Sequence, residues 1–392
     1  MPDMNAHERL TFGPNMVDWE TRVDFAKLRA DRFARAQAAM KQQGIDYLLL
    51  SRLENCRYVT AIKRIYWPTI RLGSGPVVLL PQEGQPVIWI TDPEFASETL
   101  TWVPKDRFRD GPEMELPGDV RQLLDESAEY FPDVRTATVG VDIWSPAMKD
   151  VMPVEWPDAK LVDGQATMQV AKSRKTAEEV ALMKMGYVIS EAGMHAAYEA
   201  LKPGVRESEL VGIALKRFWD FASETTQCSV SLNSGPGSFP YRRFHTDRII
   251  QWGDAVNMDF GGCFNGYFGD FCRNFVCGGK PTPGQLEWIK RSHDLQMRSL
   301  AAIRPGVTPA QLSAEVDNHP SMGHGIGISA FEPPHLRPRD DYVLESGMTF
   351  SVVTPMSFGD RKSGGFHLED EVVVTETGCE VYSTYPYFGI NL

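Results

Sequence analysis

Two aspartates on either side of a tight turn are the first residues in this sequence that could do chemistry. Asp259 and Asp270 are separated by ten residues, and the dipeptide Asn265-Gly266 between them is typical of a two-residue β-turn. A hairpin here would bring both aspartates to paired strands, over one face of a sheet. Two buried carboxylates that lie close together repel each other unless a cation is placed between them. The pair therefore indicates a metal site, and the alternative is two solvated aspartates that flank a turn.

A histidine and a glutamate further along the chain add donors that suit the same site. His324 stands between glycines in the segment 323–327, Gly-His-Gly-Ile-Gly, and glycines let a backbone approach a site closely. Alternation along a strand places His367, Glu369 and Glu371 on one face. Carboxylates with one imidazole suit Mn, Fe, Co or Zn, and bridging carboxylates would give a two-metal site that activates water. Taken singly, a histidine or a glutamate at a strand end is more typical of a structural or solvated residue.

The elements that must position these residues follow a pattern that occurs twice. The segment 200–205 (Ala-Leu-Lys-Pro-Gly-Val) recurs as 302–307 (Ala-Ile-Arg-Pro-Gly-Val), each after a helix and before another amphipathic segment. The strand-like segments 253–259 and 347–353 then lead into the two hairpins that carry the acidic residues. Ordered matches at similar offsets indicate a duplicated α+β half. Such a duplication predicts a pseudo-two-fold sheet with a site on its axis.

The first third of the chain alternates helix-like and strand-like segments and predicts a compact α/β domain. Residues 22–43 have a helical apolar period that stops at Gly44, a residue typical of helix C-termini, and a second helix is predicted over 119–130. Short strands are predicted over 46–50, 77–80, 87–91 and 137–141. The basic and aromatic segment 63–68 is either a solvated loop or a lid that presents Trp67 to a ligand.

A capping box begins a long helix in the second part of the chain. The Thr176 hydroxyl and the Glu179 carboxylate can satisfy free N–H groups at a helix start, and the helix is predicted to run to about Leu201. The composition of the chain changes just before this helix. We therefore expect an N-terminal domain over residues 1–167 and a C-terminal domain over residues 168–392.

Length, charge and hydropathy exclude several classes of protein. The chain has 392 residues, of which 42 % are hydrophobic, and this composition excludes a disordered protein. With 40 basic and 52 acidic residues the net charge is −12, which disfavours nucleic acid as a partner. No apolar run approaches the length of about 18 residues that spans a bilayer, and residues 1–20 show no secretory signal. Six cysteines without a CxxC pair indicate free thiols, so we expect a cytoplasmic protein without a membrane partner.

In their order along the chain, these motifs resemble those of the methionine aminopeptidase, prolidase and creatinase family. The motifs are Asp259-x10-Asp270, Gly-His-Gly-Ile-Gly at 323–327, Gly-Met-Thr-Phe at 347–350 and Leu-Glu-Asp at 368–370. The first third of the chain is similar to the creatinase/prolidase N-terminal domain, so the resemblance covers nearly the whole chain. It implies an α/β N-terminal domain followed by a duplicated α+β pita-bread catalytic domain. Members with this N-terminal domain are commonly homodimers, and we expect a homodimer.

The resemblance gives metal-ligand roles to four residues and leaves a fifth position without a ligand. Asp259, Asp270, His324 and Glu369 fall on four of the five ligand positions of the family. The fifth ligand is a glutamate, and this chain has Val353 there, which is also the partner position of Asp259 in the internal repeat. A valine cannot bind a metal. The resemblance therefore implies a weakened dinuclear site or a single ion of Mn, Fe, Co or Zn, and creatinase shows that the fold also supports a metal-free site.

Other departures from the peptidase pattern fall around the same site. The peptidases carry a histidine before the first aspartate, where this chain has either a displaced His245 or none. They carry another histidine after the Gly-His-Gly motif, where this chain has Phe331. Cys272 replaces the usual threonine after the second aspartate, and His367 replaces an arginine before the last glutamate. These changes imply a family member that has moved from peptides to a small non-peptide molecule.

The resemblance and the residue chemistry together give roles to individual side chains. The expected catalytic residues are His324, His367, Glu369 and His245. A histidine with a pKa near neutrality can act as a base and then as an acid, which is why His367 and His245 are expected to transfer protons. The expected substrate contacts are Trp67, Tyr267 and Phe331.

Four functions are open at this point. The first is hydrolysis of an amide, amidine-like or related C–N bond in a small polar metabolite, as in creatinase and ectoine hydrolase. The second is an Xaa-Pro metallopeptidase that tolerates the loss of one ligand. The third is a carbon–sulfur lyase similar to the dimethylsulfoniopropionate lyases, which keep the glutamate that is Val353 here. The fourth is a non-catalytic binding protein, which the retained His324 and paired aspartates disfavour. We expect the first function.

Overall fold

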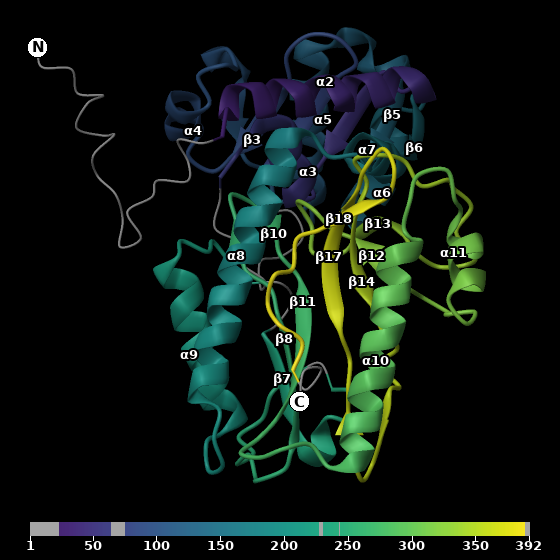
Figure 1. Cartoon of the computed structure of the whole chain (residues 1–392). Coiled ribbons are helices and arrows are strands. Elements are labelled where there is room, and N and C mark those ends of the chain that lie inside the picture. Colours follow the sequence, from purple (N-terminus) through teal and green to yellow (C-terminus); the bar gives the residue numbers. More distant parts are fainter. Residues whose placement is uncertain (1–22, 64–74, 227–229, 243, 389–392) are drawn as a thin grey trace, which may run out of the picture.

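Two domains stacked one above the other make up the structure (Figure 1). The computed structural model describes residues 23–63, 75–226, 230–242 and 244–388. The N-terminal α/β domain, purple to blue in Figure 1, lies above the C-terminal domain, which runs from teal to yellow. Within the described ranges, none of the helices combines the length and the apolar character needed to cross a bilayer.

The N-terminal domain is built around a six-stranded mixed sheet in the order β4-β3-β2-β1-β5-β6. Its strands are β1 (Tyr47–Leu50), β2 (Val77–Pro81), β3 (Val87–Ile90), β4 (Phe108–Asp110), β5 (Thr138–Val141) and β6 (Lys160–Asp163). Its helices are α2 (Phe25–Gln43), α3 (Leu53–Thr60), α4 (Pro93–Thr99), α5 (Pro117–Tyr130), α6 (Pro146–Glu155) and α7 (Gly164–Lys172). Strands β1, β2 and β3 are buried along their whole length, which explains their unbroken apolar sequences.

The predicted helices and strands of this domain are confirmed to within a few residues. Helix α2 ends at Gly44, whose left-handed φ of 67° lets its N–H bond back to carbonyl groups of the last turn. The segment 64–74, which includes Trp67, lies outside the described residues, so the lid hypothesis stays a prediction. The division at residue 167 also stays a prediction; helix α7, which packs against α2, spans that position.

The C-terminal domain contains a curled antiparallel sheet in the order β13-β12-β14-β17-β11-β8-β7, with β18 paired to β17. Its strands are β7 (Ser231–Ser234), β8 (Ala255–Phe260), β9 (Cys263–Phe264), β10 (Tyr267–Phe268), β11 (Phe271–Val276), β12 (Gly323–Gly325), β13 (Glu332–His335), β14 (Thr349–Val353), β15 (Gly359–Asp360), β16 (Gly364–Gly365), β17 (Glu369–Val374) and β18 (Cys379–Val381). Its helices are α8 (Ala177–Ala200), α9 (Glu207–Asp220), α10 (Pro283–Ala302) and α11 (Pro309–Glu315).

The predicted duplication is visible in this sheet. Strands β7, β8 and β11 on one side correspond to β12, β14 and β17 on the other, and the two halves meet where Cys272 pairs with Glu369. The helix pair α8 and α9 precedes the first half, and α10 and α11 precede the second. Helix α8 begins at the predicted capping box, in which the Glu179 N–H donates to Thr176 Oγ1 and the Thr176 N–H donates to Glu179 Oε2.

One face of the sheet packs against the helices. Phe271 of β11 lies 4.9 Å from the ring of Tyr187 on α8, measured between ring centroids. Between these apolar contacts, a buried ion pair joins Arg273 of β11 to Asp370 of β17, with Nη2 and Oδ1 2.7 Å apart. Gln296 of α10 donates to the second carboxylate oxygen of Asp370. Phe271 and Arg273 of β11 therefore lie on the face of the sheet that is turned toward the helices.

The Arg273→Met variant is expected to lose about 3–5 kcal/mol of unfolding free energy, because it leaves the Asp370 carboxylate buried without its cation. Both side chains are completely buried, so solvent cannot compensate for the loss. Urea denaturation followed by circular dichroism measures the change. The matched control is Arg298→Met on α10, whose partly exposed guanidinium pairs with Asp294 and Asp317 and whose loss should cost several-fold less. Equal effects of the two substitutions would contradict the prediction.

Candidate active site

Four adjacent strands of the curled sheet, β8, β11, β17 and β14, each place one residue in a single row across the sheet. The register pairs Asp259 with Cys272, Cys272 with Glu369, and Glu369 with Val353. Directly paired residues point to the same face of a sheet, so this row has the order acid, thiol, acid, valine. Asp259 and Val353 occupy equivalent ends of the row, as the internal repeat predicts.

Three carboxylates converge over this row. Asp259, Asp270 and Glu369 each offer a ligand atom, and these atoms all lie within 4.8 Å of one another. Asp270 and Glu369 are buried, and Asp259 is partly buried. The predicted meeting of the two aspartates over one face is confirmed, with Glu369 added from the second half of the repeat. Negative charge at this density requires a cation or bound protons, so the group is suited to a divalent metal ion.

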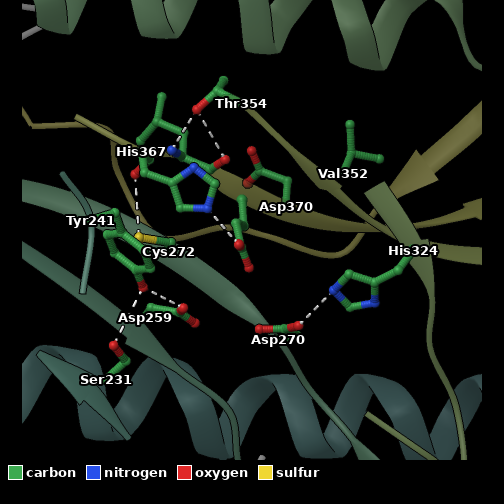
Figure 2. Close-up of polar contacts among 12 residues, drawn as sticks. Ser231, Tyr241, Asp259, Asp270, Cys272, His324, Val352, Thr354, His367 and Asp370 are labelled. Atoms are coloured by element: carbon green, nitrogen blue, oxygen red, sulfur yellow. Dashed lines mark hydrogen bonds and ion pairs between the residues drawn. The ribbon is translucent and has the colours of Figure 1, made fainter. Parts of the chain in front are cut away.

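His324 approaches the carboxylates from strand β12. Its Nε2 lies 3.4 Å from Asp270 Oδ2, and its Nδ1 lies 3.1 Å from the carbonyl oxygen of Gly325 (Figure 2). A carbonyl oxygen can only accept, so Nδ1 is the donor to Gly325, and Nε2 is the ring nitrogen directed at the carboxylates. A histidine held through one ring N–H, with its other nitrogen toward a carboxylate cluster, has the arrangement of a metal ligand. The glycines beside it are needed, because a Cβ at Gly323 would collide with the carbonyl oxygen of Ser351 on β14.

Phe331 covers the imidazole of His324. The two rings are stacked, with centroids 3.8 Å apart and planes inclined by 25°. Phe331 is 44 % exposed, and its ring packs on the histidine. An aromatic hydrocarbon thus stands where the resemblance places a second histidine in the peptidases. This position fits the predicted substrate contact, which stays a prediction.

Two ring-bearing residues donate hydrogen bonds to the outer carboxylates. His367 Nε2 lies 2.6 Å from Glu369 Oε1, and Tyr241 Oη lies 2.6 Å from Asp259 Oδ2 (Figure 2). The centroids of the two donor rings are 5.3 Å apart. Burial raises the pKa of Tyr241 well above its usual value, and the neighbouring Asp259 raises it further, so the phenol keeps its proton and acts as a donor.

Tyr241 was not predicted from the sequence. It lies on the loop after β7, where Asn233 Nδ2 donates to the carbonyl oxygen of Arg242 over 2.5 Å and so holds the loop against the sheet. The one sequence signal for this contact is the pair of polar residues Ser231 and Asn233, which alternate along β7 and can hydrogen-bond to the loop. The histidine expected in this region, His245, makes no hydrogen bond or ion pair with the carboxylates among the residues described. Its predicted role in proton transfer is therefore not supported.

Cys272, in the middle of the row, is a neutral thiol. Its Sγ is completely buried and lies 3.2 Å from the carbonyl oxygen of His367, to which it donates. Burial raises the pKa of this thiol well above its usual value, and Asp259 and Glu369 raise it further. The thiol therefore helps to fix the main chain of His367 and adds no charge to the site.

Tyr267 lies away from the cluster, contrary to its predicted role as a substrate wall. Its side chain is 0 % exposed. Its hydroxyl donates to Glu179 Oε1 over 2.8 Å and accepts from Arg32 Nη1 of the N-terminal domain over 3.2 Å. The phenol thus donates within its own domain and accepts from the N-terminal domain, and its ring is buried in the contact between the two. Trp67 lies outside the described residues.

Two family models match the chain. The model of metallopeptidase family M24 matches residues 181–376, and the model of the creatinase/prolidase N-terminal domain matches residues 32–174. An uncharacterized peptidase of Bacillus subtilis is 24 % identical over 356 residues, which cover 88 % of this chain and 95 % of that protein. The ectoine hydrolase of Halomonas elongata is 24 % identical over 396 residues, with 91 % and 95 % covered.

The fold is shared with solved structures of the same type. An Xaa-Pro dipeptidase from Bacillus anthracis matches with a TM-score of 0.76 and 22 % identity, over 92 % of this chain and 98 % of that chain. At this sequence identity the structural similarity establishes the pita-bread fold, and it does not identify the substrate. The two family matches cover the α/β domain and the curled sheet with its carboxylates. The chain therefore belongs to metallopeptidase family M24 and is a hydrolase of its creatinase/prolidase type.

Proposed function

We propose that this chain hydrolyses an amide or amidine-like C–N bond in a small polar metabolite. The observation that carries the proposal is the compact cluster of Asp259, Asp270 and Glu369, bordered by the exposed ring of Phe331. An acidic floor beside an aromatic face suits a small planar group with positive or partial positive charge, such as an amidinium. A fourth carboxylate is missing because Val353 ends the row.

The residues present fit a divalent cation. Asp259, Asp270 and Glu369 would hold it, and Nε2 of His324 lies beside the same carboxylates, 3.4 Å from Asp270 Oδ2. Oxygen donors with one imidazole suit Mn, Fe, Co or Zn. When bound, such an ion would act as a Lewis acid toward the carbonyl oxygen or amidine nitrogen of the substrate.

The protein's own groups have separate tasks in this proposal. Tyr241 and His367 orient the outer carboxylates, and Phe331 limits the space above His324. His367 is the described histidine with a direct hydrogen bond to a cluster carboxylate. We assign to it the movement of a proton between the substrate nitrogen and Glu369.

The relatives support two competing substrates. The ectoine hydrolase aligns over 91 % of this chain, in keeping with a C–N bond in a small metabolite. The Bacillus anthracis structure and the Bacillus subtilis relative are a dipeptidase and a peptidase by name, in keeping with an Xaa-Pro peptide. The replacement of a family ligand by Val353 and the aromatic ring of Phe331 favour the first.

A substrate panel tests the proposal directly. Purified protein supplied with Mn²⁺ is incubated with ectoine, creatine, small amides, Xaa-Pro dipeptides and dimethylsulfoniopropionate. Products are followed by NMR, and dimethyl sulfide is followed in the headspace. We expect turnover of at least one amide or amidine and a loss of at least about 100-fold in the Asp270→Asn variant, because a cluster carboxylate becomes a neutral amide.

The control for this experiment is Asp294→Asn, the same substitution at an exposed aspartate of α10, which should keep full activity. Turnover confined to Xaa-Pro dipeptides would replace the proposal by the peptidase. Release of dimethyl sulfide alone would replace it by the lyase.

Removal of the aromatic ring at residue 331 is expected to weaken substrate binding more than the chemical step. A ring contact contributes about 0.5–1.5 kcal/mol, so Phe331→Ala should raise KM by about 2- to 12-fold with a smaller change in kcat. Steady-state kinetics with the substrate found in the panel measure both constants. Phe331→Tyr should restore KM, and Phe95→Ala on α4, at a phenylalanine 73 % exposed, should change neither constant. An unchanged KM in Phe331→Ala would exclude Phe331 from the binding site.

A further inference from the structure

We infer that Asn274 and Glu371 are positioning residues that join the two halves of the repeat where main-chain pairing between them stops. Asn274 holds His367 in place, and Glu371 holds Asp270. The inference rests on the proposed function for the tasks of His367 and Asp270. It goes beyond that function because it assigns the residues that fix both of them.

The two halves of the repeat meet where β11 lies beside β17, and we call this line the seam. On either side of the seam the strands are paired over longer stretches, β8 with β11 along Ala255–Phe260 and β14 with β17 along Thr349–Val353. At the seam, the register in the described part of the chain consists of the pair Cys272 and Glu369. Buried main-chain groups need hydrogen-bond partners, so side chains must supply the bonds that strand pairing does not.

Asn274 takes the place of a main-chain partner for His367. The register of Cys272 with Glu369, continued by two residues, puts Asn274 opposite His367. The N–H of His367 donates to Asn274 Oδ1 over 3.0 Å, and its carbonyl oxygen accepts from Asn274 Nδ2 over 2.7 Å. A residue in a hydrogen-bonded antiparallel pair makes the same two bonds with the main chain opposite. The carboxamide of Asn274 thus replaces a peptide group of β11.

The main chain that Asn274 fixes carries the imidazole that reaches Glu369. Nε2 of His367 lies 2.6 Å from Glu369 Oε1. The Cys272 thiol donates to the carbonyl oxygen of His367 that Asn274 also contacts. Asn274 and His367 are buried, so solvent does not compete for these bonds. Asn274 therefore sets where the ring of His367 stands relative to Glu369.

Glu371 makes the corresponding link toward the other end of the seam. The same register, continued by two residues in the opposite direction, puts Glu371 opposite Asp270. The main-chain N–H of Asp270 donates to Glu371 Oε2 over 3.2 Å, and both residues are completely buried. The side chain of Glu371 thus replaces a main-chain acceptor. It holds the main chain from which Asp270 enters the cluster.

Arg273 bridges the seam between these two links. Its Nη1 donates to the carbonyl oxygen of Cys272 over 3.0 Å and to that of Glu369 over 2.8 Å. Side chains therefore join the two halves at successive places along the seam, through Asn274, Arg273 and Glu371. Because each half supplies part of the carboxylate cluster, the seam sets how the two parts meet.

The link between Asn274 and His367 is tested by NMR on protein without substrate or metal. Histidine is labelled at its ring nitrogens, whose chemical shifts respond to the hydrogen bond with Glu369, and Glu369→Leu gives the values for the lost bond. We expect Asn274→Leu to move the His367 shifts toward those values, because the ring loses its position when both main-chain bonds are removed. Unchanged shifts in a folded Asn274→Leu variant would overturn the link.

The matched control for a buried asparagine is Asn257→Leu, which should leave the ring shifts of His367 unchanged. Asn257 stands opposite Asn274 on β8, is 1 % exposed, and donates to Asn233 and Ser238. Asn274→Asp is a milder variant that keeps an acceptor and loses the donor, so it should move the shifts by an intermediate amount. It decides the test if circular dichroism shows Asn274→Leu to be unfolded.

Kinetics with the substrate found in the panel separate positioning from a general loss of structure. A misplacement of about 1 Å near a reacting group costs about 100-fold in rate, so Asn274→Leu should lower kcat by about 100-fold with little change in KM. This loss should not add to that of His367→Gln, because both variants remove the same ring from its place. Additive losses would contradict the role of Asn274 as the positioning residue of His367.

The link between Glu371 and Asp270 is tested by hydrogen exchange of the Asp270 amide, measured by NMR without metal. Glu371→Leu removes the acceptor and should speed exchange, whereas Glu371→Gln keeps a side-chain oxygen and should preserve protection. Equal exchange in the two variants would overturn this link.

Mn²⁺ binding relates the Glu371 link to the proposed function. With Mn²⁺ as the probe, Glu371→Leu should bind the ion about 10- to 100-fold more weakly than Glu371→Gln, and equal affinities would contradict the positioning of Asp270. If the unaltered protein binds no Mn²⁺, the metal-dependent part of the proposed function fails, and hydrogen exchange and ring shifts still decide the inference.

Discussion

The repulsion among three carboxylates held within 4.8 Å of one another is the constraint on which the active-site half of this structure depends. Asp259 and Asp270 come from the hairpin of the first half of the repeat, and Glu369 comes from β17 of the second half. Asp259 accepts a hydrogen bond from Tyr241, and Glu369 accepts one from His367, so each of these two carboxylates has a donor that stabilises its negative charge. The remaining charge leaves the centre selective for a cation.

The strands that carry the three carboxylates are also held in place by contacts on the opposite, helix-facing side of the sheet. Glu369 and Asp370 are neighbours in β17 and point to opposite faces of the sheet, one to the cluster and one to the helices. Asp370 is neutralised by Arg273 and accepts further hydrogen bonds from Gln296 and Tyr387. Arg273 also donates to the main-chain oxygen of Glu369. A buried ionic network thus sets the register that brings Glu369 opposite Cys272.

The departures from the peptidase pattern are local substitutions on an unchanged scaffold. Val353 occupies a register position that the two-fold repeat makes equivalent to Asp259, and the strands around it are paired without a gap. Phe331 precedes Glu332, which is buried and paired with Lys175 at 2.6 Å, so the segment that carries the aromatic ring is anchored firmly. The fold therefore tolerates new chemistry at these positions because its stability depends on other contacts.

The sequence by itself determined the hydrophobic periodicity of the helices and strands, the internal repeat of the C-terminal domain and the residues that share a strand face. These are local properties, and so the hairpin of Asp259 and Asp270, the strand of Glu369 and the unusual Val353 were predicted correctly in position, whereas His367, expected on that strand, precedes it. The tertiary structure alone decided which distant side chains reach them. Tyr241 rather than His245 enters the site, because β7 anchors its loop through Arg242. Tyr267 faces Arg32 instead of substrate, because the docking of one domain on the other, which no spacing encodes, consumes its hydroxyl.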